Sequence, residues 1–192
     1  MNTHITGSRP RSLRPRLSIP LLAIATTSLA AGIVSGGLAY LNRSPDHEAH
    51  VAGTTAWWPH LVLLALTAII TTAIVRQRGP HATRLLLLAP LGTTAANRLT
   101  HTIGSILNRP SALPRLLLAI PPTALLIYSP FRAGMQILGG LDPNFTANAW
   151  GGPTYLGAMA CHYLDGALLT AAAAALLNLL LLPAEHGKQA TG

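Results

Sequence analysis

Residues 57–75 read WWPHLVLLALTAIITTAIV, and His60 is the only residue in this run that can become charged. A helix rises about 1.5 Å per residue, so a run of this length nearly crosses a hydrocarbon core of about 30 Å. Trp57 and Trp58 open the run, and tryptophan is enriched where a span meets the lipid headgroups. We therefore predict a membrane-spanning helix that starts at an interface.

Three further apolar runs have comparable or greater length, at residues 17–41, 116–138 and 155–182. Prolines interrupt the second of them, and membrane helices accept proline where neighbouring groups satisfy the freed carbonyls. Half of the chain is apolar, only 9% is charged and the mean hydropathy is +0.43, whereas soluble proteins carry about 25% charged residues. The sequence predicts an all-α fold, a polytopic transmembrane helix bundle.

This bundle is expected to occupy residues 17–183, between a disordered basic tail at 1–16 and a polar tail at 184–192. The net charge of +8 resides mainly in segments that flank the spans. That placement follows the positive-inside rule and puts the N-terminus in the cytoplasm, whereas a nucleic-acid interface would need one basic surface. The flanking arginines are Arg9, Arg11, Arg14, Arg16, Arg76, Arg78, Arg84, Arg109 and Arg115. Lys188 is the only lysine, which indicates a GC-rich bacterial genome and hence a plasma membrane.

The segment 85–107 is ambiguous. It begins with four leucines, but Arg98 and His101 then share one face while apolar residues recur every three or four positions on the other. Such a helix either lies at the cytoplasmic interface or re-enters partway, which gives four spans. Otherwise it spans, turns its polar face to the bundle interior and makes five.

Two signals favour four spans with both termini inside. Four spans collect most of the flanking arginines on one side, and they bring most aromatic side chains near the other interface. Five spans would scatter both groups. The aromatic residues concerned are Tyr40, Trp57, Trp58, Tyr128, Phe131, Phe145, Trp150 and Tyr155.

Ser28, Gly32 and Gly36 recur every fourth residue in the first span. Small residues at this spacing let another helix approach closely. Glycine is also simply frequent in membrane helices, so the pattern alone does not decide between the two interpretations.

Polar side chains inside spans are costly, and this makes them the candidate functional site. His162 and Asp165 stand three residues apart and share a helix face. An ionised Asp165 in lipid needs a partner, for which Arg98, Arg132, His60 and His162 qualify. The full candidate set is His60, Arg98, His101, Arg132, Tyr155, His162 and Asp165.

Three interpretations of this set compete. A buried polar pair can fix the register of two helices. A His–Asp pair can instead exchange protons with a wet cavity. A metal or haem site through His162, with His60 or His101, is the third, but its spacing is weak, so no cofactor or metal is predicted.

The run at 148–166 is NAWGGPTYLGAMACHYLDG. Its Gly-Gly-Pro forms a turn, and Thr154 can cap the following helix and aim Tyr155, His162 and Asp165 at a shared pocket. The run resembles small uncharacterised actinobacterial multi-pass membrane proteins. That resemblance implies a multi-pass membrane location and no particular activity.

The leading functional hypothesis is a non-enzymatic accessory subunit or small transporter-like bundle. Such a protein would have the lipid bilayer as its surroundings and a second copy or another membrane protein as its partner. The alternative is a membrane-embedded enzyme in which His162 and Asp165 act as an acid–base pair near the outer face.

Overall fold

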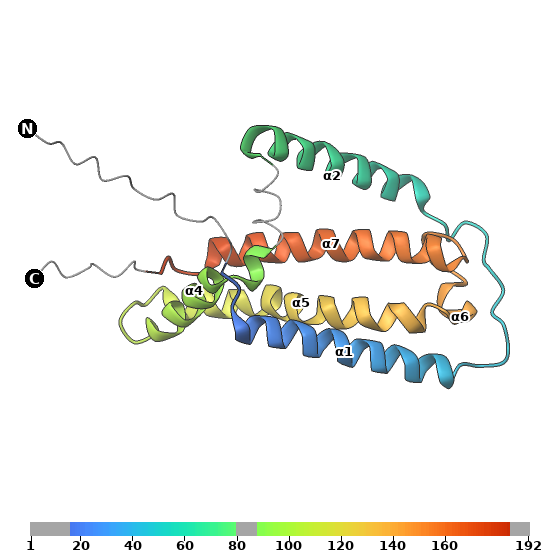
Figure 1. Cartoon of the computed structure of the whole chain (residues 1–192), viewed down its shortest axis with the longest axis horizontal. Helices are drawn as coiled ribbons and strands as arrows, with labels where there is room; N and C mark the ends of the chain where they lie inside the picture. The colour runs from blue at the N-terminus through green and yellow to red at the C-terminus, as the bar shows by residue number, and fades with distance from the viewer. Residues whose placement is uncertain (1–15, 80–87, 185–192) are drawn as a thin grey trace, which may run out of the picture.

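A computed structural model of the chain describes residues 16–79 and 88–184 (Figure 1). Four of its helices are long and apolar enough to cross a membrane, which confirms the all-α, four-span bundle. Of the tails predicted at 1–16 and 184–192, residues 1–15 and 185–192 lie outside the described residues. The elements are α1 (Ile19–Leu41), α2 (Trp57–Arg78), a 3₁₀ turn η1 (Ala89–Leu91), α4 (Thr93–Gly104), α5 (Ala112–Gly139), α6 (Pro143–Thr146) and α7 (Tyr155–Leu180).

The ambiguous segment forms no fifth span. Its helix, α4, has only 12 residues, or about 18 Å at 1.5 Å per residue. Leu88, the last of the four leucines and the only one among the described residues, does not join α4, because Pro90 and the extended backbone at Gly92 end the helical path before α4 begins. Figure 1 shows α4 at the end of the bundle where α5 starts, which we call the α4 end. The four-span alternative for this segment is therefore the correct one.

Helices α1 and α5 run parallel and almost touch backbone to backbone. A Cβ atom added at Gly32 would lie 2.0 Å from the carbonyl oxygen of Phe131, and one added at Gly36 would lie 2.1 Å from that of Met135. Ser28, in the same stripe, donates its hydroxyl to a backbone carbonyl of α5 at 2.6 Å. The small-residue stripe is thus a close packing surface, as one interpretation of the sequence predicted.

Helix α7 packs antiparallel to α5. The hydroxyl of Tyr155 donates to the carbonyl oxygen of Ile137 at 3.2 Å, and the hydroxyl of Tyr163 donates to the carbonyl oxygen of Ala133 at 3.4 Å. Helix α5 continues through its internal prolines as one helix. Figure 1 shows α1, α5 and α7 side by side along the bundle, and we call these three helices the core.

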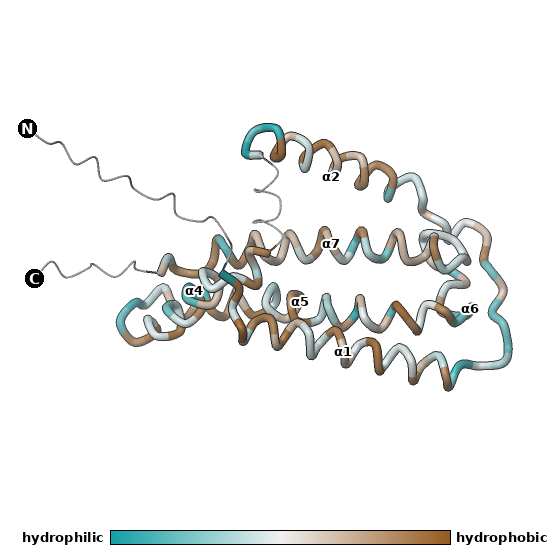
Figure 2. The backbone as a smooth tube through the Cα atoms, viewed as in Figure 1, coloured by the Kyte–Doolittle hydropathy of each residue, from teal (hydrophilic) through white to brown (hydrophobic). Residues whose placement is uncertain are grey.

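Helix α2 is attached to the core only near its first turns. Figure 1 shows it diverging from α7 toward the α4 end, and Figure 2 shows that apolar residues recur along its length. His60 is its only buried residue. Its large apolar side chains are exposed and suit a lipid environment. They include Leu61, Val62, Leu64, Leu66, Ile69 and Ile70.

The opposite end of the bundle is closed by two interlocked loops, residues 42–56 and 140–154, and we call it the loop end. The side chain of Asn144 accepts from the backbone N–H of Glu48 at 2.8 Å and donates to the carbonyl oxygen of Asp46 at 2.7 Å. Asn148 accepts from a further backbone N–H of the first loop at 2.9 Å. The amide side chains of Asn144 and Asn148 thus bond the backbone of the first loop at three points and hold it in place.

Candidate functional site

His60 of α2 and Asp165 of α7 form a hydrogen-bonded pair between the two helices. The Nε2 atom of His60 lies 3.2 Å from Oδ2 of Asp165, and the two side chains are 6% and 28% exposed. His60 lies one turn into α2 and Asp165 lies about three turns into α7, so both belong to apolar segments and the acid is the deeper of the two. Among the four partners that the sequence allowed for Asp165, the structure brings His60 to it.

The hydrogen bond of the second ring nitrogen of His60 determines which protonation states this pair can adopt. Nδ1 of His60 lies 2.7 Å from the carbonyl oxygen of Ala56. A carbonyl only accepts, so Nδ1 carries a hydrogen. Nε2 then either donates to an ionised Asp165, as an imidazolium, or accepts from the protonated acid. Both arrangements hold one proton between the two groups and have no net charge, which reduces the cost of burial.

Trp150 holds the other side of the histidine. Its ring lies 5.5 Å from the His60 ring, centroid to centroid, at 55°. The carbonyl oxygen of Trp150 also accepts from the backbone N–H of Ala56 at 2.8 Å, just before α2 begins. The loop at 140–154 therefore positions both the start of α2 and the histidine of the pair.

A polar pocket of about 340 Å³ adjoins the pair at the loop end. Arg132 of α5 and His162 of α7 line its helical side, and the two interlocked loops form the rest. The ring of His162 lies edge-on to Phe145, with centroids 6.3 Å apart. We call this cavity the loop-end pocket, and its lining residues are Glu48, Arg132, Asn144, Phe145, Asn148, Ala149, Trp150 and His162.

The two charged side chains of this pocket are not paired with each other. Within the described part of the chain, neither Arg132 nor Glu48 has a side-chain hydrogen bond or an ion pair. The pocket therefore presents a guanidinium and a carboxylate to whatever enters it, beside the proton-bearing pair.

Arg98 does not reach Asp165, contrary to one contact considered from the sequence. Its guanidinium donates to the carbonyl oxygens of Asn178, Leu181 and Leu182 at the last turn of α7. Carbonyls at a helix C-terminus lack intrahelical donors and carry partial negative charge, so an arginine is well suited there. Arg98 is thus a structural cap at the α4 end, about 20 Å along α7 from the acid.

His101 and Tyr155 also lie apart from the pair. His101 belongs to α4, and its buried Nδ1 has no hydrogen-bond partner among the described residues. The Tyr155 hydroxyl bonds to the α5 backbone. The shared pocket expected for Tyr155, His162 and Asp165 is therefore not formed, because these residues face α5, the loop-end pocket and α2 respectively.

Sequence reasoning missed the loop residues of the site. Glu48 and Asn144 belong to segments that read as polar connections, and in the run at 148–166 the sequence selected Tyr155, His162 and Asp165 but not Asn148 or Trp150. The available signal is the run NFTANAW at 144–150, which carries two amides and two aromatic rings in seven residues. Thr154, by contrast, caps α7 as predicted, accepting from the backbone N–H of Gly157 at 3.2 Å.

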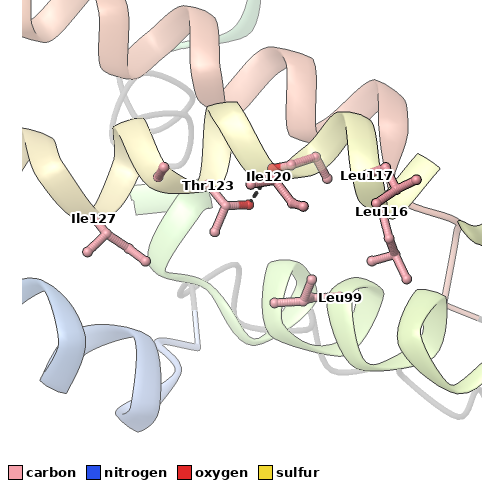
Figure 3. A pocket seen from close by; sticks show the side chains of 8 residues that line it. Leu99, Leu116, Leu117, Ile120, Thr123 and Ile127 are labelled. Atoms are coloured by element: carbon pink, nitrogen blue, oxygen red, sulfur yellow. Dashed lines mark hydrogen bonds between the residues drawn. The ribbon is translucent and has the colours of Figure 1, made fainter. Parts of the chain in front are cut away.

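A second hollow, of about 430 Å³, lies between α4 and α5 (Figure 3). Leu99 and the α5 side chains make it almost wholly apolar, and the Thr123 hydroxyl in it donates to the carbonyl oxygen of Ala119 at 2.7 Å. It offers no group for acid–base or ligand chemistry. In residues 16–79 and 88–184, no three His, Cys, Asp or Glu side chains are grouped as a metal site.

Comparisons with protein-family models, with curated proteins and with solved structures found no match for this chain.

Proposed function

We propose that this chain is a non-enzymatic, transporter-like membrane protein in which one proton on the His60–Asp165 pair controls the position of α2. The observation that carries the proposal is the pair itself. Among the described residues it is the only side-chain hydrogen bond that joins α2 to another helix. The remainder of α2 has little contact with the core, so a change at this one contact can move the helix.

The charge state of the pair determines how strongly it holds. With one proton, a donor faces an acceptor and the contact is favourable. Removing that proton leaves an ionised Asp165 facing the lone pair of His60 Nε2, and two acceptors repel. Adding a second proton removes the charge attraction and leaves a buried imidazolium, which is costly in a span. Either change weakens the link between α2 and α7.

The proposal places the loop end outside. Arg76, Arg78, Arg109 and Arg115 belong to the other end of the spans, and positive residues are retained on the cytoplasmic side. In this proposal protons reach the pair from the loop-end pocket, whose lining residue Trp150 packs against the ring of His60. A plasma-membrane location with both termini inside belongs to this proposal.

Pulsed electron–electron resonance tests the coupling. Spin labels on Ala73→Cys and Leu179→Cys, in a Cys161→Ala background, report the distance between α2 and α7 near the α4 end. We expect this distance to change across the pH range in the otherwise unaltered protein. In Asp165→Asn the amide can donate to a neutral His60 or accept from the imidazolium and is itself uncharged throughout, so the distance should stay constant.

Asp46→Asn is the matched control, because Asp46 is an exposed loop acid whose contact uses its backbone carbonyl. It should keep the pH response of the parent. A distance that ignores pH in the parent, or that changes equally in Asp165→Asn, contradicts the proposal.

An accessory-subunit role is the second candidate, and the exposed apolar length of α2 favours it. A stable protein partner on α2 would protect cysteines placed at Leu64 or Ile69 from lipid-soluble reagents. In the transporter-like reading, lipid covers these positions and they react freely in the native membrane. The enzyme hypothesis is weakened by geometry, because Asp165 bonds His60 rather than its intended partner His162.

A further inference from the structure

We infer that the loop-end pocket binds a small zwitterion, a molecule with an oxyanion and an ammonium group. This inference deepens the proposed function, on which it rests for its role, by naming the substrate class. The pocket's volume of about 340 Å³ lies at the lower end of the range of about 300–1,000 Å³ for small-molecule sites. It therefore suits a compact solute.

Arg132 provides the oxyanion side of the site. A guanidinium in a membrane-spanning segment is costly and is normally paired. Arg132 belongs to α5, lines the pocket and has no ion pair among the described residues. Its planar fork of donors matches a carboxylate or phosphate with two parallel hydrogen bonds. A bound oxyanion supplies the partner that the described protein residues do not.

Glu48 provides the ammonium side. Its backbone N–H is fixed to the amide of Asn144, so the residue is held at the pocket by the interlocked loops. Its carboxylate and the guanidinium of Arg132 line one cavity without coming within 4.0 Å of each other. The separation leaves room for a ligand that carries both charges.

Aromatic rings and charge balance support the same ligand class. Phe145 and Trp150 both line the pocket, and aromatic faces attract ammonium groups. The charges of Arg132 and Glu48 cancel. A simple anion engages only the arginine and a simple cation only the glutamate, whereas a zwitterion presents an opposite charge to each.

The pocket is also connected to the moving part of the molecule. Trp150 lines it and packs against the ring of His60, and His162 lines it one turn from Asp165. A ligand that contacts Trp150 therefore acts directly on the joint between α2 and α7. This contact is the physical route by which binding and proton uptake would influence each other.

Calorimetry on the full-length chain in phosphatidylglycerol nanodiscs tests the ligand class. The probes are glycine betaine and the neutral α-amino acids, with 3,3-dimethylbutanoate as the anion of the same shape and choline as the cation. We expect a zwitterion to bind at least about tenfold more tightly than either singly charged analogue, a difference of one decade in Kd. Equal binding of the butanoate or of choline, or no binding by any zwitterion, overturns the inference.

Variants locate the site. Arg132→Gln and Glu48→Gln should each weaken zwitterion binding at least about tenfold. Arg43→Gln is the control, because Arg43 lies at the same end but packs on Tyr40 outside the pocket. Undiminished binding by both pocket variants would contradict the assignment, and far-ultraviolet circular dichroism confirms that each variant is folded.

Two sources offer this chemistry, a soluble zwitterion and the headgroup of phosphatidylethanolamine. Competition by phosphatidylethanolamine in the nanodiscs identifies the lipid, and unchanged binding identifies the solute. Asp165→Asn separates this inference from the proposed function, since it should abolish the pH response of α2 while zwitterion binding stays within about threefold. If α2 shows no pH response in the parent protein, only the proposed function is contradicted. If the parent protein binds no zwitterion, only the zwitterion site is contradicted.

Discussion

At the scale of single residues, His60 shows how one backbone carbonyl determines the chemistry of a site. Ala56 fixes the hydrogen on Nδ1, and this leaves Nε2 and Asp165 to share the remaining proton. The sequence identified both residues as candidates. It could not select His60 over Arg98 or Arg132 as the partner, because that choice depends on how α2 and α7 are rotated about their axes.

Replacing Asp165 with alanine should lower the free energy of unfolding by about 1–3 kcal/mol, the cost of leaving a buried nitrogen unpaired. Asp165→Asn retains a donor for His60 Nε2 and should lose much less. Titration with sodium dodecyl sulfate, followed by circular dichroism, measures both. Equal losses in the two variants would show that the hydrogen bond contributes nothing.

Arg98→Ala should lower the free energy of unfolding by about 2–3 kcal/mol, because charged hydrogen bonds to the end of α7 are lost. Arg98→Lys keeps the charge but not the planar fork, and should recover only part of the loss. Arg78→Ala, at the exposed end of α2, is the control and should have little effect. The same titration applies, and equal effects at positions 78 and 98 would contradict the capping role.

At the scale of elements, length and hydropathy were sufficient to predict the four spans. Two boundaries shifted by three or more residues, since α2 continues to Arg78 and α5 begins at Ala112. Basic residues are favourable in the last turn of a helix, so α2 extends beyond the end of its apolar run through Arg76 and Arg78. Segment 85–107 was harder, because its period showed an amphipathic helix but not its end at Gly104.

Gly32→Ala should lower the free energy of unfolding by about 1–3 kcal/mol, as overpacking does, because its Cβ would meet the α5 backbone. Gly166→Ala is the matched control in α7. An added Cβ there meets nothing within 4 Å, and alanine favours a helix by up to about 1 kcal/mol. The free energy of unfolding should therefore fall in Gly32→Ala and rise in Gly166→Ala. An unchanged free energy of unfolding in Gly32→Ala would mean that α1 and α5 can separate freely.

Asn144→Ala should release the loop at 42–56, because both hydrogen bonds of its amide are lost. Asn144→Asp can still accept from Glu48 but cannot donate to Asp46, so its loop should exchange faster than in the parent and more slowly than in Asn144→Ala. Hydrogen–deuterium exchange of peptides that cover residues 46–51 measures the change. Exchange that is as slow in Asn144→Ala as in the parent would contradict the interlocked loops.

At the scale of the whole molecule, the loop end carries the site and the α4 end carries the structural arginines. The sequence indicated this division through the positions of aromatic and basic residues. It could not show that the two connecting loops bind one another, because contacts between segments about 100 residues apart depend on the packed helices and leave no local pattern.

Cysteine labelling tests the orientation. In a Cys161→Ala background, Ser44→Cys should react with an impermeant maleimide added to whole cells. Pro110→Cys, between α4 and α5, should react only after the membrane is opened. The reverse pattern would invert the proposed orientation and place the pocket on the cytoplasmic side.

The backbone contact between α1 and α5 has a consequence in time. Ser28 and the carbonyl that it bonds lie 99 residues apart in the chain, and ribosomes add about 5–20 residues per second. Helix α1 therefore waits about 5–20 s before its partner is synthesised. Through that interval the face of α1 that carries Ser28, Gly32 and Gly36 is open to lipid and to any neighbouring helix. The closest helix contact of the bundle therefore forms only after more than half of the chain has been synthesised.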